Sequence, residues 1–328
     1  MKRALRWAGF AIAGFVVILG LALGVVYFLS QSRMDKTYHV TPSPLMASAG
    51  ILAGGGSVGG ETDGNGPPGS EEADTDPIST AVARGEHLAV TRGCTDCHGA
   101  DLGGAVFADD MPVFRISGSN LTPGGVGAFY SDEDWVRSIR HGVRPDGRPL
   151  LFMPSYEFYY LSDDDVASLI EYFRSLPPVE RDLRENSVGP LGRILFLTGK
   201  LPLLPAEMID HEGPRPESPP PGVTIEYGAY LAVGCSGCHG ETLSGGPIPG
   251  VPPDWPEAAN ITPDPATGIG RWSRDDFFRA LREGMRPDGT ELRGEFMPWP
   301  NLKQMKDDEL EALWMYLSSL EGKPYGGR

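Results

Sequence analysis

The sequence predicts an all-α fold in which two similar helical domains follow an N-terminal transmembrane helix. Three observations support this prediction. The N-terminus carries one long uncharged apolar run, a set of short motifs occurs twice, and apolar residues recur at helical spacing near the end of each copy. No stretch favours a β-sheet. The chain divides into an anchor at 1–36, a linker at 37–78, a first domain at 79–178, a connector at 179–222 and a second domain at 223–328.

The N-terminal apolar run is long enough to cross a membrane. Residues 8–29 would extend about 33 Å as a helix, and a bilayer core is about 30 Å thick. A cleaved signal peptide is the alternative, but its apolar region would span only about 7–15 residues with a small-residue cleavage site close behind. The nearest such triplet, Ala47-Ser48-Ala49, lies far downstream. We therefore expect a retained anchor, with the basic residues before it on the cytoplasmic side.

The linker and the overall charge give weaker information. Glycine, serine, proline and acidic residues dominate the stretch at 41–77, which predicts a flexible tether. Residues 1–36 carry a net charge of +4, and because the whole chain carries −16, residues 37–328 carry −20. This surplus of acid favours protein partners with a basic docking face, although ordinary solubility explains much of it. We expect no nucleic-acid partner and no small-molecule substrate.

All the cysteines of the chain fall in two boxes of the pattern C-x-x-C-H. The boxes are Cys94, Cys97 and His98 in the first domain and Cys235, Cys238 and His239 in the second. This pattern is the attachment signature of c-type haem, because each thiol can add to a porphyrin vinyl group while the histidine binds the iron. A four-cysteine zinc site, a redox dithiol and structural disulfides are alternatives, but none explains why His-Gly follows both pairs. We predict two covalently bound haem c groups.

The motifs around the two boxes show that the second domain repeats the first. The matching segments are 85–89 with 228–232, 120–123 with 260–263, 131–135 with 273–277, 144–147 with 286–289, and 152–154 with 296–298. The first copy has two extra residues around Thr91-Arg92. Each copy has a helix before the box, another from Ser131 or Ser273, and a closing amphipathic helix. The expected core residues of the closing helices are Val166, Leu169, Ile170, Phe173 and Leu176, and Leu310, Leu313, Trp314, Leu317 and Leu320.

The repeat also tests which residue binds each iron opposite the histidine. A ligand needed in both copies should recur in both, and Met153 and Met297 do so, each between Phe and Pro. His87 and His141 are replaced by Tyr230 and Glu283 in the second copy, so neither is expected to bind iron. Three further methionines have no counterpart in the other copy and are Met111, Met285 and Met305. We predict His/Met coordination in both domains.

The order of these motifs resembles class I cytochrome c domains, and more narrowly the cytochrome c subunits of periplasmic alcohol and gluconate dehydrogenases. The resemblance covers about residues 80–178 and 222–321. It implies a haem cradled by the first and last helices of each domain, with Gly85 and Gly228 allowing close approach near Tyr172 and Tyr316. It also implies that the loops at Asn120 and Asn260 follow the haem edge, although a proline-terminated turn explains them equally well. Such subunits usually carry three haem domains, whereas this chain has two.

The connector between the domains is too apolar for a free linker. Its apolar stretches are 193–197 and 201–205. We expect it to pack across both domains and to fix their orientation, with docking of a partner or a membrane as the alternative. His211, which lies among prolines, is expected at the surface.

Together these features predict a membrane-anchored dihaem electron carrier in the inner membrane, with its haem domains on the periplasmic side. It would relay electrons between a periplasmic dehydrogenase or quinol-oxidising complex and a terminal acceptor such as an oxidase or reaction centre, and would not itself be an enzyme. A dihaem peroxidase or thiosulfate-oxidising enzyme is the alternative, but it would need an open iron with an acid–base group or a fifth cysteine beside it. A redox sensor or assembly module has less support, because no signalling domain is evident.

Overall fold

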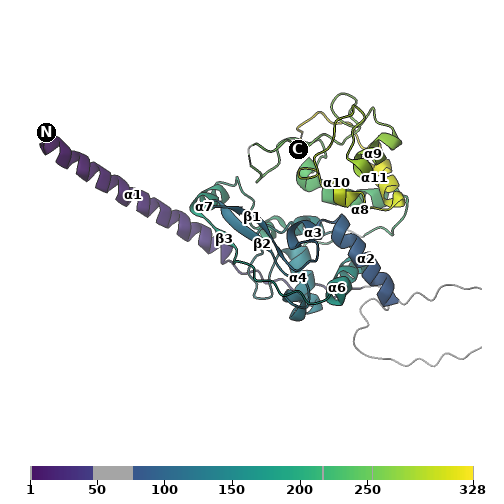
Figure 1. Ribbon diagram of the computed structural model, residues 1–328, viewed down its shortest axis with the longest axis horizontal. Helices are drawn as coiled ribbons and strands as arrows, with labels where there is room; N and C mark the ends of the chain where they lie inside the picture. The colour runs from purple at the N-terminus through teal and green to yellow at the C-terminus, as the bar shows by residue number, and fades with distance from the viewer. Residues whose placement is uncertain (1, 47–76, 216–217, 253, 328) are drawn as a thin grey trace, which may run out of the picture.

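The computed structural model describes residues 2–46, 77–215, 218–252 and 254–327. A long helix projects from the first of two domains, and the second domain lies against the first (Figure 1). The helices of the first domain are α2 (Pro77–Thr91), α3 (Cys94–His98), α4 (Asp132–His141), α5 (Ser155–Phe158) and α6 (Asp163–Ser175), with the 3-10 turn η1 (Val126–Ala128). Those of the second are α8 (Ile225–His239), α9 (Arg274–Glu283), α10 (Trp299–Leu302) and α11 (Asp307–Ser319).

The projecting helix, α1 (Lys2–Met34), is longer than the predicted span of 8–29. Its segment Arg6–Met34 has a mean hydropathy of 2.7 in its most apolar window, and none of that window is buried. It is therefore no core helix of the folded domains. By length and composition, α1 could cross a membrane.

The start of the predicted flexible linker is bound to the first domain. The Tyr38 amide donates to the Gly147 carbonyl at 2.8 Å, and the Met46 amide donates to Asp163 Oδ2 at 3.0 Å. Between them, Arg137 Nε donates to the Val40 carbonyl. A free tether is therefore wrong for residues 37–46, because their backbone groups find partners on the domain. The rest of the predicted tether, 47–76, lies outside the described residues.

In each domain the first and last helices pack directly on each other, as the family resemblance implied. A Cβ atom on Gly85 would lie 2.0 Å from the Ser168 carbonyl oxygen, and one on Gly228 would lie 2.0 Å from that of Ala312. Only glycine permits these crossings of α2 with α6 and of α8 with α11. The added Cβ atoms would also lie 2.6 Å from Cβ of Tyr172 in the first crossing and 2.7 Å from Cβ of Tyr316 in the second.

The helix starts and core residues also agree with the sequence. Ser131 and Ser273 cap α4 and α9, each in a capping box with the aspartate three residues later. The predicted core residues of α6 and α11 are buried or partly buried. One cluster of buried apolar side chains, including Leu169 and Leu313, runs through both domains.

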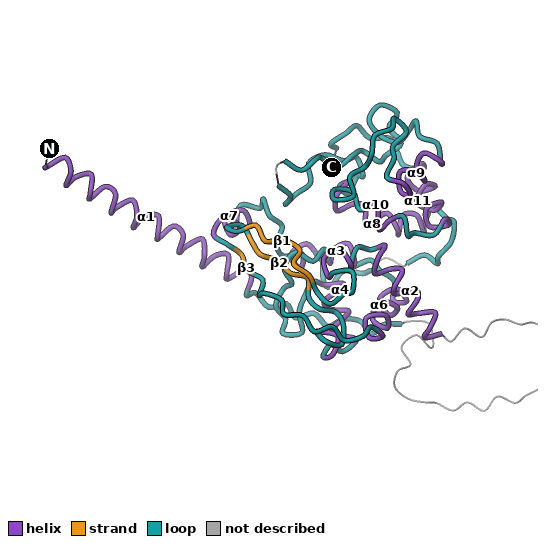
Figure 2. Tube along the Cα trace, in the orientation of Figure 1, coloured by secondary structure: helices purple, strands orange, loops and turns teal. Residues whose placement is uncertain are grey.

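The all-α prediction is wrong in one place, where the first domain has a small antiparallel sheet (Figure 2). Strand β1 (Ala105–Asp110) pairs with β2 (Phe114–Gly118), and β2 pairs with β3 (Ser187–Val188). The pairing of β1 and β2 runs from Ala105 opposite Gly118 to Asp110 opposite Phe114 and shifts between Val106 and Ala108. Short strands, this shift and acidic residues in β1 leave no period-2 signal in the sequence.

The connector packs chiefly on this sheet and not equally on both domains. It contains α7 (Pro190–Leu197) and the 3-10 turn η2 (Pro205–Met208). A second apolar cluster joins β2 to the connector and consists of Phe114, Ile116, Phe196, Leu201, Leu203 and Leu204. Toward the second domain, Pro202 lies beside Gly250. His211 is partly buried, and its Nδ1 lies 3.1 Å from Nδ1 of His141, so the surface expectation for it is wrong.

Candidate functional site

The two C-x-x-C-H boxes are both helical, but they are built differently. In the second domain the box forms the last turn of α8. In the first domain α2 ends at Thr91, Gly93 turns the backbone into the left-handed region with φ 73°, and the box forms the separate helix α3. The two extra residues of the first copy cause this break. One of them, Arg92, consequently points toward the second domain.

Both histidines of the boxes are held in the same tautomer. His98 Nδ1 lies 2.7 Å from the Ser119 carbonyl oxygen, and His239 Nδ1 lies 2.7 Å from that of Ala259. A carbonyl accepts only, so Nδ1 carries the proton and Nε2 has the lone pair that could bind a metal. Burial also lowers the pKa of His98, which favours its neutral, ligating form.

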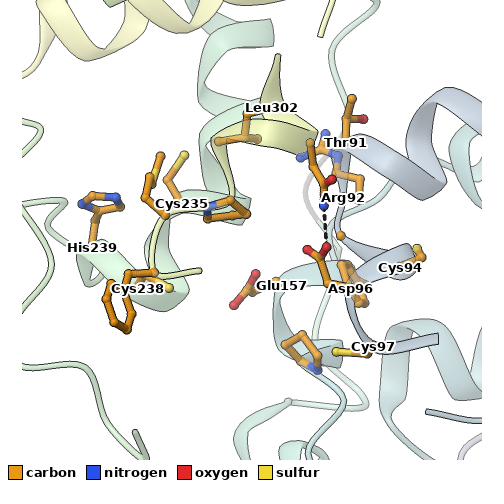
Figure 3. A pocket seen from close by; sticks show the side chains of 18 of the residues that line it. Thr91, Arg92, Cys94, Asp96, Cys97, Glu157, Cys235, Cys238, His239 and Leu302 are labelled. Atoms are coloured by element: carbon orange, nitrogen blue, oxygen red, sulfur yellow. Dashed lines mark hydrogen bonds between the residues drawn. The ribbon is translucent and has the colours of Figure 1, made fainter. Parts of the chain in front are cut away.

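A largely apolar cavity of about 770 Å³ connects the two boxes. It brings together all the residues predicted to hold haem. These are Cys94, Cys97, His98 and Met153 from the first domain and Cys235, Cys238, His239 and Met297 from the second. Figure 3 shows the two cysteine pairs on opposite sides of the cavity. Such a volume and lining suit a large, mainly apolar cofactor.

Three residues of the cavity wall carry a buried polar atom that has no hydrogen-bond partner in the described structure. These atoms are Nε1 of Trp135, Nη2 of Arg92 and Oγ of Ser117. Unpaired buried donors are costly unless a ligand accepts from them. A porphyrin with anionic propionates would supply such acceptors. The apolar lining and these three donors therefore fit haem.

The thiols do not fit the alternatives of a dithiol or a zinc site. Burial raises the pKa of Cys94 to about 12 and those of Cys97 and Cys235 to about 11. A reactive dithiol needs the thiolate, whose formation these values oppose. Within the described ranges, no group of three or more His, Cys, Asp or Glu side chains is placed to hold a metal ion.

Both predicted methionine ligands lie on the cavity wall at the start of a short helix. Pro154 caps α5 directly after Met153, and Pro298 caps α10 directly after Met297. The preceding Phe152 has a φ of 67°, and its amide donates to the Leu203 carbonyl at 3.0 Å. The connector thus holds the loop of Met153 in a strained conformation.

Other candidate ligands lie elsewhere. The ring of His87 contacts Glu309 and that of His141 contacts His211, and neither histidine lines the cavity. Met305 is buried in the core and also reaches the cavity wall, whereas Met111 is exposed. Met285 is partly buried. None of these changes the predicted ligands, which stay a prediction.

The loops at Asn120 and Asn260 are hydrogen-bonded to the segment that follows the closing helix of each domain. Asn120 Nδ2 donates to the Val179 carbonyl at 2.7 Å, and Asn260 Nδ2 donates to the Lys323 carbonyl at 2.7 Å. Each side-chain oxygen accepts from the threonine two residues later. Both asparagines therefore fix the segment that follows the closing helix. Leu121 and Ile261 of the same loops line the cavity, so a course along the haem edge stays a prediction.

Sequence reasoning missed a polar junction between the two boxes. Asn301 Nδ2 donates to Asp96 Oδ1, and Glu157 lies between the cysteine pairs (Figure 3). A Cβ on Gly237 would lie 2.0 Å from Glu157 Oε1, so the carboxyl group is pressed against the second box. Burial raises the pKa of Glu157 to about 7, although a hydrogen bond with Tyr156 opposes the rise.

A second set of polar contacts joins the domains at their outer helices. His87 Nε2 on α2 lies 2.8 Å from Glu309 Oε2 on α11. Tyr230 on α8 donates to Asp165 on α6 and accepts from the Ser162 amide at 3.0 Å. Arg92 Nη1 donates to the Leu231 carbonyl at 3.1 Å. The repeat alignment contains a signal for the His87–Glu309 and Tyr230–Asp165 contacts, because they use equivalent positions in the two copies. Arg92 has no equivalent in the second copy.

Comparison with known proteins agrees with the double motif. The family model for Cytochrome c matches the chain at residues 82–177 and again at 225–321. The chain is 30% identical over 280 residues to the cytochrome c subunit of a quinone alcohol dehydrogenase of Gluconacetobacter polyoxogenes, covering 76% of this chain and 58% of that protein. It is 30% identical over 283 residues to the cytochrome c subunit of gluconate 2-dehydrogenase of Pantoea cypripedii, covering 76% and 62%.

A third relative has a more similar length. A diheme cytochrome c-type protein of Cereibacter sphaeroides is 27% identical over 271 residues, which cover 73% of this chain and 86% of that protein. By contrast, the chain spans only about three fifths of the two dehydrogenase subunits. The resemblance to subunits of this kind, expected from the motifs, is confirmed.

Proposed function

The chain belongs to the cytochrome c family, and we propose that it is a membrane-anchored dihaem carrier that relays single electrons. In this proposal each C-x-x-C-H box holds one covalent haem c. His98 and His239 bind the irons on one side, and Met153 and Met297 bind them on the other. The family follows from the comparisons, whereas the electron-transfer role, the ligands, the number of haems and the anchor are part of the proposal.

The observation that carries the proposal is the shared cavity. Both boxes and both methionines lie on its wall, and each histidine has its Nδ1 bound to a carbonyl. Haem c with such ligands supplies a one-electron couple at an iron that has no open coordination position. The surrounding residues hold the histidines in one tautomer, present the four cysteines for thioether attachment and surround the cofactor with apolar side chains.

The relatives suggest the kind of partner. Two of them are named as cytochrome c subunits of dehydrogenases. We propose that this chain likewise accepts electrons from a periplasmic dehydrogenase or a quinol-oxidising complex and passes them to an oxidase or reaction centre. The net charge of −20 on residues 37–328 favours a partner with a basic face. The apolar exposed helix α1 supports an anchor in the inner membrane.

A potentiometric titration of the full-length protein, followed optically with and without cyanide, tests the proposal. We expect two reversible one-electron waves at positive potentials, neither of which changes when cyanide is added. A low-potential wave, or immediate cyanide binding at one haem, would show that one methionine does not bind iron. The enzyme alternative would then be favoured. Mass spectrometry of the same sample should show two haems attached through the four cysteines.

A further inference from the structure

The connector helix α7 is bound to the C-terminal end of α1 through Arg193. Arg193 donates from Nη1 to Ser30 Oγ at 2.8 Å and from Nη2 to Gln31 Oε1 at 2.9 Å. Its guanidinium lies 4.3 Å from the ring centroid of Tyr27. These contacts fix α7 beside the final turns of α1 and remove the freedom that a flexible tether would have allowed.

A second arginine strengthens the same joint from the other helix. The guanidinium of Arg33 on α1 lies 4.1 Å from the ring centroid of Phe196 on α7. Arg33 Nε also donates to Glu207 of η2 at 3.1 Å. Because Phe196 is buried in the connector's own apolar cluster, the end of α1 is tied to the core of the first domain.

The contacts between α7 and α1 fix the position of α7 relative to the membrane that α1 would cross. Its partners Tyr27, Ser30 and Gln31 lie at the end of the predicted span of 8–29, where a spanning helix leaves the hydrocarbon core. In Figure 1, α7 is the part of the folded domains that lies nearest the N-terminal end of α1. The helix therefore lies at the level where the outer membrane interface would be.

One face of α7 carries exposed apolar side chains at this level. Leu191 and Ile194 are 43% and 39% exposed, and their spacing of three residues puts them on one side of the helix. Met111, 52% exposed, lies beside them, because the Leu191 amide donates to the carbonyl of Pro112 at 3.2 Å. We call Met111, Leu191 and Ile194 the α7 patch.

We propose that the α7 patch lies in the outer interface of the lipid bilayer and sets the orientation of the first domain on the membrane. This inference rests on the proposed anchor, because it takes its depth from α1. Apolar side chains on an interfacial helix enter the boundary between headgroups and acyl chains, and Tyr27 is of the aromatic type found at that level. Arg33 is paired with Glu207 and Arg193 is bound to α1, so the attraction for anionic headgroups would come mainly from Lys200, close after α7, although the rest of the soluble part is acidic.

The proposal predicts which side chains contact lipid. If the native cysteines are all consumed by haem attachment, a single introduced cysteine can carry a nitroxide label. We would prepare full-length holoprotein with Leu191→Cys or Ile194→Cys in vesicles of phosphatidylethanolamine and phosphatidylglycerol. Collision of the label with oxygen, which enters lipid, is then compared with collision with a water-soluble nickel chelate. We expect a severalfold higher oxygen-to-nickel ratio at both positions than at Phe129→Cys, a matched apolar control that is 84% exposed on the first domain.

A label at Val17→Cys separates this inference from the anchor itself. It should report deep lipid if α1 spans the bilayer. If Val17→Cys reports lipid while both α7 labels react with nickel as the Phe129→Cys label does, the α7 proposal is wrong and the anchor stands. Labels at 191 and 194 that are shielded from both reagents would indicate a protein partner and also overturn it. If Val17→Cys is exposed to water, the anchor fails and the inference fails with it.

Discussion

Asn301 of α10 donates a hydrogen bond to Asp96 in the C-x-x-C-H box of the first domain. The bond therefore joins the helix that follows the predicted ligand Met297 to the box of the other domain. Asn301 lies four residues after Met297, and Asp96 is the second residue between Cys94 and Cys97. When the two domains exchange roles, the position of Asn301 is taken by Glu157, four residues after Met153, and that of Asp96 by Gly237. These two are also in contact. The junction is therefore reciprocal.

The outer contacts show the same reciprocity. His87 and Tyr230 occupy equivalent positions in the first helices, and Asp165 and Glu309 do so in the last helices. His87 contacts Glu309, and Tyr230 contacts Asp165. The two domains thus meet like the halves of a two-fold symmetric dimer, in which each surface patch meets its own counterpart. Such an interface holds the two boxes at a fixed separation, as a relay within one chain requires.

The first prediction concerns this junction. Asn301→Ala removes the hydrogen-bond partner of the Asp96 carboxylate, whose pKa is already raised by partial burial. Because Asp96 is exposed to solvent, the lost hydrogen bond should cost only about 0.5–1 kcal/mol. We expect the variant to unfold at lower urea concentration and to exchange electrons between its haems more slowly after a flash of photoreduction.

Asp101→Ala is the matched control for a junction variant Asp96→Ala. Asp101, three residues beyond the box, pairs with Arg181 of the connector and makes no contact with the second domain in the bonds that hold it. Its loss should leave electron exchange between the haems unchanged. If both aspartate variants have the exchange rate of the wild type, the junction does not set the geometry of the relay.

The second prediction concerns Glu157, whose pKa is raised to about 7 by burial. A glutamate in the unfolded chain has a pKa of about 4.3. Between about pH 4.3 and pH 7 the folded state therefore binds more protons at this group than the unfolded state does. Stability from this group is complete below about pH 4.3 and is lost as pH rises through about 7. Glu157→Gln keeps a neutral amide, as Asn301 does at the equivalent position. It should therefore be more stable than the wild type at pH 8, by on the order of 1–3 kcal/mol, and equal to it near pH 4.

Urea unfolding of the holoprotein across this pH range checks the prediction. The exposed Glu321 provides the control, because Glu321→Gln should follow the wild type at every pH. If the difference in unfolding free energy between Glu157→Gln and the wild type does not grow between pH 4 and pH 8, the carboxyl group is not buried in the holoprotein.

These contacts mark the limit of prediction from the sequence. The helix caps at Ser131 and Ser273 and the crossings at Gly85 and Gly228 could be predicted, because each depends on residues close together or on a motif that occurs twice. Asp96 and Asn301 are 205 residues apart, and nothing local marks either as an interface residue. The repeat contains the information needed to find such contacts. When the two copies are aligned, the positions of Asp96 and Asn301 correspond to those of Gly237 and Glu157, which are also in contact.

The sheet and the joint with α1 were missed for a related reason. Strand β3 is two residues long and comes from the connector, so its pairing with β2 depends on the tertiary fold. Arg193 resembles any surface arginine until α7 lies beside α1. The composition that predicts a flexible tether describes the stretch 41–77 alone, whereas the domain is held through residues at 27–33 and through the connector.

The third prediction tests the iron ligands. Met153→Ala and Met297→Ala should each lower the potential of one haem, by on the order of a hundred millivolts, because axial ligands set haem potentials over a range of about 0.8 V. Each variant should also bind cyanide at that haem alone. Met305→Leu is the control, since Met305 reaches the same cavity wall but is predicted to be core. Unchanged spectra and potentials in both alanine variants would remove the methionines from the site.

The last prediction concerns the crossing of α8 with α11, which holds the second box in place. Gly228→Ala would put a methyl group 2.0 Å from the Ala312 carbonyl oxygen and 2.7 Å from Tyr316 Cβ, so the helices must separate. Overpacking of this severity should cost about 3 kcal/mol or more. Gly222→Ala, just before the same helix, is the control, because its Cβ would meet nothing nearer than Thr224 Cγ2 at 3.9 Å. Alanine there should be neutral or stabilise by up to about 1 kcal/mol, since it restricts the unfolded chain. Thermal unfolding of the holoprotein measures both, and equal midpoints for the two variants would mean that the close crossing does not exist in solution.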